Sequence, residues 1–136
     1  MKFIADANLL SEATKPSPDD RAVAWLRNNE SQLAVTPVIL GELEFGILLL
    51  PSGRRKKRLE LWFDQIRSTV LSLDFDNSTA AAWARLLANL KSKGLVMPVK
   101  DSLIAASAIA HNLAIATRNT RDFQQAGIPL INPFEE

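Results

Sequence analysis

The sequence predicts an α/β protein in which a central parallel sheet is flanked by helices. Short apolar segments that suit strands alternate along the chain with longer segments that suit helices. The strand segments are apolar on both alternating faces, as expected of parallel strands covered by helices on both sides. The chain has 136 residues and no linker long enough to divide it, so we expect a single domain over residues 1–136.

The first half of the chain is predicted to contain two strands and two helices. Residues 2–6 suit a buried strand and are too few for a helix. After the break at KPSPDD, Asp19 or Asp20 caps a helix. A second strand covers residues 33–36 and ends in a threonine followed by a proline. That pair is a favourable helix start, so we expect a helix over 36–50, ended by the Pro-Ser-Gly that follows.

A basic cluster, RRKKR over residues 54–58, leads into the next helix. Residues 70–75 suit a strand, and Asn77 or Ser78 caps the helix after it, which Gly94 ends. The basic cluster could contact phosphate groups, or it could be an ordinary solvated helix start. Positive side chains at the amino end of a helix oppose the helix dipole, which is a hint of another purpose.

The last third of the chain is predicted to hold a helix and two strands. The helix is alanine-rich, covers 101–110 and is closed by Asn112. Strands over 113–117 and 129–132 follow. His111 lies at the carboxyl end of the helix, where a cation is favourable, and we interpret it as structural.

The composition excludes several kinds of site. The absence of cysteine excludes disulfides, thiolate metal sites and cysteine nucleophiles. A single histidine excludes a His-rich zinc site, and neither Ser11 nor Ser102 has a histidine partner within sequence reach. The net charge is only +1, so any surface that binds nucleic acid must be local. No segment approaches the ~18–20 apolar residues of a membrane span or resembles a signal peptide, and we expect a cytoplasmic protein.

Three acidic residues lie at the edges of apolar segments: Asp6, Glu42 and Asp101. An ionised carboxylate removed from water is costly unless a positive group neutralises it, so converging acids would favour a hard cation such as Mg²⁺ or Mn²⁺. Each position also has a simpler interpretation. Asp6 could be a turn residue and Asp101 an ordinary helix N-cap. The neighbours of Glu44 are as apolar as those of Glu42, so periodicity does not choose between the two.

Polar residues follow two of the predicted strands. In an open parallel sheet the ligand crevice lies beyond the carboxyl ends of the strands. Asp6 ends the first strand, Arg118 and Asn119 follow the strand over 113–117, and Asp122 comes shortly after them. We therefore expect these side chains at one edge of the sheet. Strand order is not readable from the sequence, so this argument does not extend to the acids on the helices.

Together, these segments resemble the PIN-domain ribonucleases, and most closely the VapC/FitB-type toxins of bacterial toxin–antitoxin pairs. The resemblance covers nearly the whole chain and is carried by FIADANLLSE, VILGELEFGI, KDSLIAASAIAHNLAIATRNTRDF and INPF. It implies a single PIN-like domain, and it selects Glu42 over Glu44 as the acid of the family's glutamate helix. The third segment is the most specific, because it holds an acid, an alanine-rich helix, a strand and TRNTRDF in one unbroken order.

Two positions depart from the family pattern. Ala7 stands where the family usually has threonine, so a hydroxyl near the site is missing. Asn119 stands where many relatives have a fourth acid, and Asp122 is the nearest replacement carboxylate. The fourth site position therefore falls to Asn119 or to Asp122.

The resemblance implies metal-dependent endonucleolytic cleavage of RNA. Asp6 and Asp101 would hold Mg²⁺ or Mn²⁺, and Glu42 would complete the site or orient the attacking water, with Asp122 as a further catalytic acid. The ion would activate that water and offset the charge that develops on the phosphate. For substrate binding, the expected contacts are Arg118, Asn119 and Arg121.

The resemblance also implies partners. These toxins are neutralised by a cognate antitoxin whose tail covers the acidic groove, often with a basic side chain among the acids. A homodimer is expected, with operator DNA bound only through the antitoxin. Two other functions stay open, a PIN-like DNA nuclease and a binding subunit that has lost catalysis. Ala7 and Asn119 favour the latter, whereas the retained acids argue against it.

Overall fold

The computed structural model describes residues 1–135 and contains one five-stranded, fully parallel sheet. The strand order is β3-β2-β1-β4-β5, so the first strand lies in the middle of the sheet. Residues of β1 pair with β2 on one side and with β4 on the other. The strands are β1 (Phe3–Ala5), β2 (Leu33–Val35), β3 (Leu71–Ser72), β4 (Ala114–Ala116) and β5 (Leu130–Ile131).

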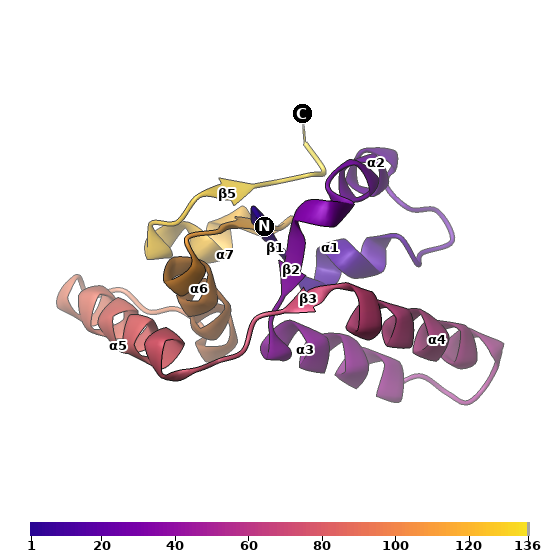
Figure 1. Ribbon diagram of the computed structural model, residues 1–136, viewed down its shortest axis with the longest axis horizontal. Coiled ribbons are helices and arrows are strands. Elements are labelled where there is room, and N and C mark those ends of the chain that lie inside the picture. Colours follow the sequence, from indigo (N-terminus) through magenta and orange to yellow (C-terminus); the bar gives the residue numbers. More distant parts are fainter. Residues whose placement is uncertain (136) are drawn as a thin grey trace.

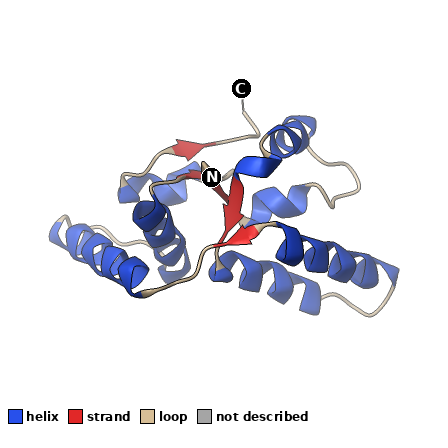
Figure 2. Cartoon of the chain, in the orientation of Figure 1, coloured by secondary structure: helices blue, strands red, loops and turns tan. Residues whose placement is uncertain are grey.

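Helices flank the sheet on both sides and confirm the predicted α/β class. Figure 1 shows α1 to α4 on one side of the central strands and α5 to α7 on the other, and Figure 2 shows how short the strands are beside the helices. Along residues 1–135, no helix is long and apolar enough to cross a membrane. The helices are α1 (Ala7–Glu12), α2 (Asp20–Asn28), α3 (Pro37–Leu48), α4 (Arg54–Thr69), α5 (Asn77–Ser92), α6 (Val99–His111) and α7 (Thr120–Phe123), with short 3₁₀ turns at Glu30–Gln32 and Gln124–Ala126.

The core lies around the three central strands. Ile4, Val35 and Ile115, one from each of these strands, are fully buried. In α6 the run of small residues predicted from the sequence is also buried and lets this helix pack closely. α6 is tied to α5 by the indole of Trp83, which donates to the hydroxyl of Ser102 at 3.0 Å. The element that carries Asp101 is therefore held rigidly.

The structure corrects several predicted boundaries. α6 begins at Val99, with Pro98 at the N-cap position, so the interpretation of Asp101 as an N-cap is wrong. The backbone N–H of Ser102 donates to the Pro98 carbonyl at 3.0 Å, which is the first bond of the helix. α5 is capped by Asp76 rather than by the two residues after it, because its carboxylate reaches the N–H of Thr79 at 2.9 Å.

Other predictions of local structure are confirmed. Thr36 caps α3 with a proline in its first turn, and Asp19 rather than Asp20 caps α2. Asn112 ends α6 in the left-handed conformation with φ of 56°, a conformation that asparagine tolerates well. The prediction of a strand over 70–75 is correct in type but too long, because β3 covers only the two residues Leu71–Ser72.

Candidate functional site

The first acid of the site is fixed by the junction of β1 and α1. Asp6 follows β1 directly and caps α1, because its Oδ1 accepts a hydrogen bond from the N–H of Leu9 at 2.9 Å. Asp6 is thus a helix N-cap and not the turn residue that the sequence suggested, and the cap holds the carboxylate at the carboxyl edge of the sheet. Only 7% of Asp6 is exposed. Burial raises the pKa of Asp6, and the nearby carboxylates of Glu42 and Asp122 add to that effect.

A buried threonine on the neighbouring strand supports Asp6. Thr117 follows β4, which pairs with β1, and its hydroxyl donates to the second carboxylate oxygen of Asp6. The same hydroxyl accepts from the backbone N–H of Asn119 at 2.9 Å. Thr117 is fully buried, and its hydrogen bond opposes the rise in the pKa of Asp6. One hydroxyl therefore links the first acid to the loop that carries the fourth site position.

The second acid is brought to the site by α3. The hydroxyl of Thr36 accepts from the N–H of Ile39 at 3.3 Å and fixes where this helix begins. Glu42 then lies on the side of α3 that faces the site, whereas Glu44 is exposed elsewhere. The ammonium of Lys100 lies 3.1 Å from Oε2 of Glu42. Glu42 is thus the candidate acid of α3, and it is held in an ion pair.

The third acid lies in the first turn of α6. Asp101 is partly buried, and burial is the main cause of the rise in its pKa. The carboxylates of Asp122 and Glu42 raise the pKa of Asp101 further, whereas the charge of Lys100 lowers it. Asp101 therefore lies within the electrostatic reach of the other acids.

The short helix α7 carries the two candidates for the fourth position. Asn119 lies just before α7, and its carbonyl accepts from the N–H of Asp122 at 3.1 Å. Both residues are exposed, and both line the same small cavity as the other acids. The fold therefore brings both candidates to the site and leaves open which of them acts there.

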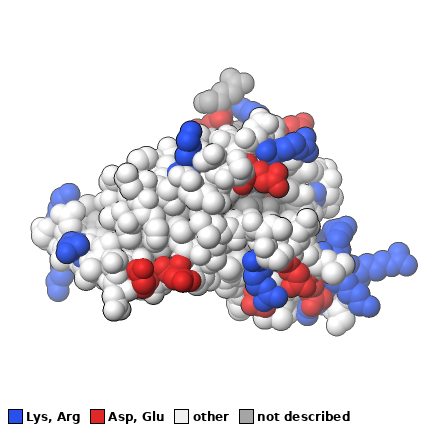
Figure 3. All heavy atoms as spheres, in the orientation of Figure 1, with Lys and Arg blue, Asp and Glu red and all other residues white. Residues whose placement is uncertain are grey.

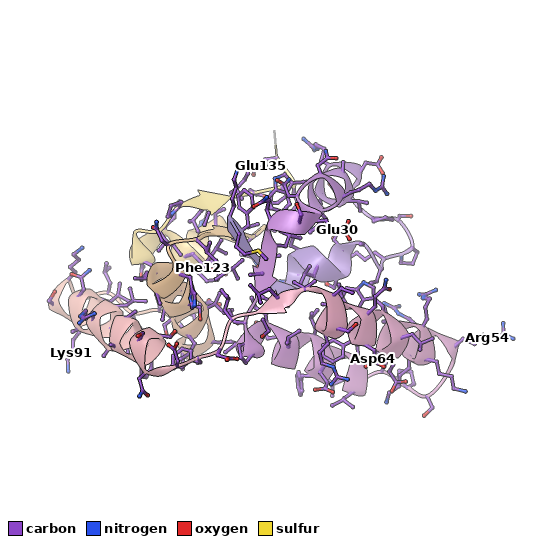
Figure 4. The ribbon with its side chains drawn as sticks, viewed as in Figure 1. Glu30, Arg54, Asp64, Lys91, Phe123 and Glu135 are labelled. Carbon is purple, nitrogen blue, oxygen red and sulfur yellow. The ribbon has the colours of Figure 1, made fainter. Side chains whose placement is uncertain are left out.

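One cavity of about 50 Å³ joins these side chains. Figure 4 labels one of its apolar residues, Phe123, beside α6 in the interior of the molecule. The acids come from four separate parts of the chain and meet at the carboxyl edge of the sheet, where the fold predicts a ligand crevice. The lining residues are Asp6, Ala7, Asn8, Glu42, Asp101, Ile104, Asn119, Asp122 and Phe123.

The donor chemistry of the cavity suits a hard divalent cation. Four carboxylates and the two amides of Asn8 and Asn119 offer oxygen ligands of the kind that Mg²⁺ and Mn²⁺ prefer. Burial and mutual repulsion already penalise the ionised forms of Asp6 and Asp101, a cost that a cation would offset. Within residues 1–135, however, no three histidine, aspartate or glutamate side chains are arranged so that they could hold one metal ion. The residues offer the right type of ligand for such an ion, but their side chains would have to shift before three of them could bind it together.

The basic residues lie beside the acidic cavity and not within it. Arg118 and Arg121 line an adjoining hollow with Asn119, and the guanidinium of Arg118 stacks on the ring of Phe134 at 4.5 Å. Positive side chains also gather where α4 begins, at the right-hand end of the molecule in Figure 3. In that cluster, Lys56 donates to the Leu48 carbonyl at the end of α3, so it has a structural role.

Two residues of the site went unrecognised in the sequence. Thr117 was placed at a strand end, but its hydrogen bond to Asp6 depends on β4 lying next to β1. Lys100 precedes Asp101, yet its pairing with Glu42 requires α3 and α6 to meet. No pattern of neighbouring residues in the sequence predicts either contact.

The fold and the acidic cavity together define a PIN domain. A family model described as "PIN domain" matches residues 3–129, and the chain belongs to this family.

Among its relatives, the chain is 33% identical over 140 residues to "VapC ribonuclease Y4jK" of Sinorhizobium fredii, covering 98% of each protein. It is 31% identical over 141 residues to "Toxin FitB" of Neisseria gonorrhoeae, covering 98% of this chain and 99% of that one. The crystal structure of FitAcB from Neisseria gonorrhoeae superposes with a TM-score of 0.88 at 31% identity, over 98% of this chain and 99% of that chain.

Proposed function

We propose that this chain is the toxin of a type II toxin–antitoxin pair and acts as a divalent-metal-dependent endoribonuclease. The proposal treats residues 1–136 as one PIN-like nuclease domain. One observation carries it: four carboxylates and two amides from distant segments line a single cavity at the carboxyl edge of the sheet in a PIN-family chain. The names "ribonuclease" and "toxin" among the relatives support the same activity.

The acids have distinct roles in this proposal. Asp6 and Asp101 would hold Mg²⁺ or Mn²⁺, and Glu42 would complete the site or orient the attacking water. When bound, such an ion lowers the pKa of water and offsets charge that develops on the phosphate. Asp122 is the charged candidate for the fourth position, and Asn119 is the neutral one. The hydrogen bonds from Leu9 and Thr117 keep Asp6 in place for this work.

The substrate is proposed to lie across the rim of the cavity. Arg118 and Arg121 share a hollow with Asn119 and Asp122, so phosphate groups bound there would lie next to the acids. Phosphate contacts of this kind release counterions, and RNA binding should therefore weaken as salt increases.

The test uses purified chain, free of any antitoxin, incubated with total RNA with and without Mg²⁺ or Mn²⁺. We expect discrete fragments that require the metal and disappear in the Asp6→Asn and Asp101→Asn variants. Asp64→Asn is the matched control, because Asp64 is an exposed carboxylate on α4 (Figure 4). Cleavage without metal, or unimpaired site variants, would contradict the proposal. Equal cleavage of single-stranded DNA would favour the DNA nuclease instead.

The antitoxin is proposed to bind in the groove that adjoins the site. This groove has a volume of about 290 Å³, runs between α1, α3 and α4, and shares Ala7, Asn8 and Glu42 with the acidic cavity. A peptide lying in it would reach Glu42 directly and could place a basic side chain among the acids. Co-expression with the product of an adjacent small reading frame should therefore suppress RNA cleavage, and DNA binding should require that partner.

A homodimer is proposed from the apolar surface of α3. Phe45, Leu48 and Leu49 are 64%, 63% and 69% exposed and lie close together at the end of this helix. Clustered exposed apolar side chains of this size mark contact surfaces in soluble proteins. The cytoplasm, where RNA is present, is the proposed location.

A further inference from the structure

An ammonium group of this chain is paired with one of its own site acids. Nζ of Lys100 is 3.1 Å from Oε2 of Glu42, and the pair joins the first turn of α6 to α3. The Lys100 side chain is 58% exposed and the Glu42 side chain 27% exposed, so the pair lies at the mouth of the site. We propose that Lys100 is a built-in counterion that holds Glu42 while no metal is bound and competes with divalent cations for it. The inference rests on the proposed metal-dependent function.

The arrangement of the acids supports this role. With Glu42 paired to Lys100, no three acidic or histidine side chains within the described residues could hold one ion. Asp6 uses one carboxylate oxygen to cap α1 and the other to accept from Thr117, so it has little freedom to move. Asp101 is fixed on a helix that is bonded to its neighbour. Glu42 is the site acid that an ion pair holds, so it is the carboxylate whose partner a metal ion would replace.

The charges around Lys100 explain why it stays there. Asp101, Glu42, Asp122 and Asp6 all contribute negative charge at this edge of the sheet. Lys100 contributes positive charge that opposes those acids, and its ammonium lies 3.1 Å from Oε2 of Glu42. A cation supplied by a neighbouring residue thus stabilises an otherwise repulsive cluster. A metal ion would take over the same role, and Lys100 would then be released at the rim where the phosphate backbone is expected.

The experiment measures metal affinity and not activity. Wild-type chain, Lys100→Gln and Lys91→Gln are titrated with Mn²⁺ alone by calorimetry, without RNA. Lys91→Gln removes the same charge at the far end of α5, where Lys91 points away from the body (Figure 4). Partly exposed ion pairs have small energies, so we expect Lys100→Gln to bind Mn²⁺ about two- to fivefold more tightly. Lys91→Gln should match the wild type, and Lys100→Arg should keep the weaker binding.

A double-mutant cycle separates the ion pair from a general effect of charge. In a Glu42→Gln background, Lys100→Gln should no longer tighten Mn²⁺ binding, because the contested carboxylate is gone. An undiminished effect in that background, or no effect in the wild-type background, would overturn the inference while leaving the metal-dependent function intact. A wild-type chain that binds no Mn²⁺ would instead overturn the proposed function, and the inference with it.

Discussion

At the scale of single residues, Asp6 is both the N-cap of α1 and a proposed metal ligand. As an N-cap it satisfies an N–H that would otherwise lack a partner, and this bond fixes the carboxylate at the edge of the cavity. A local structural role and a place in the acidic cavity are therefore compatible for Asp6. For Asp101 the predicted N-cap role is wrong, because it lies inside α6 and does not cap it.

Thr117 is expected to tune the site through Asp6. Replacing it with valine keeps the shape of the side chain and removes the hydroxyl that donates to Asp6. Partners that orient metal ligands typically contribute ~10–100-fold to metal affinity or activity, and we expect a loss of that size in Mn²⁺-dependent RNA cleavage. Thr117→Ser retains the hydroxyl and should stay close to wild type. Equal losses in the two variants would show that the methyl group, and not the hydrogen bond, is what matters.

Glu42 and Glu44 provide a matched pair for testing which acid of α3 acts. Glu42 lines the cavity and Glu44 is exposed outside it, although their positions along the helix look alike in sequence. Glu42→Gln should reduce cleavage of a fluorescent RNA by about tenfold or more, and Glu44→Gln should leave the rate unchanged. A larger loss from Glu44→Gln would contradict the assignment.

At the scale of whole elements, the cap of α3 positions the glutamate. Thr36→Ala removes the hydroxyl that accepts from Ile39, and we expect the free energy of unfolding to fall by ~0.5–2 kcal/mol. Urea denaturation followed by circular dichroism measures this change. Thr36→Ser loses the same methyl group but keeps the cap, so its stability should lie clearly above that of Thr36→Ala.

The cap of α5 is expected to depend on pH. Hydrogen bonds from the backbone N–H of Thr79 and then from its hydroxyl lower the pKa of Asp76 below its ordinary value of 3.8. A lowered folded-state pKa stabilises the folded chain above the unfolded-state value, and this contribution is lost as pH falls through the folded-state value. The difference in Tm between wild type and Asp76→Ala should therefore be full at neutral pH and shrink below about pH 4. The asparagine in Asp76→Asn does not titrate and caps α5 at neutral and at acidic pH. The Tm of Asp76→Asn should therefore stay above that of Asp76→Ala in acid.

The elements differ in how far the sequence determines them. Thr36 with its proline, and Asn112 in its left-handed conformation, act locally and could be recognised from neighbouring residues. The cap of α5 lies one or two residues before the predicted Asn77 or Ser78, because Asp76 and both of these residues suit that position chemically. The strand β3 is shorter than its apolar run because Leu71 and Ser72 pair in register with β2, after which Leu73 donates one last bond to Val35 and the chain leaves the sheet.

The residues of the site also differ in how far the sequence determines their positions. Strand ends and resemblance placed the acids near one another, as the common cavity shows. Contacts between distant elements, such as Lys100 with Glu42 and Thr117 with Asp6, depend on strand order and helix packing. Those features are set by the whole fold, so no segment could reveal them.

At the scale of the whole molecule, the exposed end of α3 bears on assembly. If the apolar side chains there form the proposed dimer, Leu48→Glu places a charge in the contact and should yield a monomer in light scattering after size exclusion. Ala88→Glu adds the same charge to the exposed surface of α5 and should leave the mass unchanged. A monomeric wild type, or a dimeric Leu48→Glu, would argue against this surface.

The order of the strands also affects when a newly made chain can become toxic. β1 is the first strand to be synthesised, yet one of its two neighbours, β4, ends only at Ala116. Until the ribosome has translated that segment, Asp6 lacks the hydroxyl of Thr117, and the cavity lacks Asp101, Asn119 and Asp122. If these side chains act as proposed, a growing chain cannot cleave RNA until its last third has been made. The site would then be assembled only when translation is nearly finished.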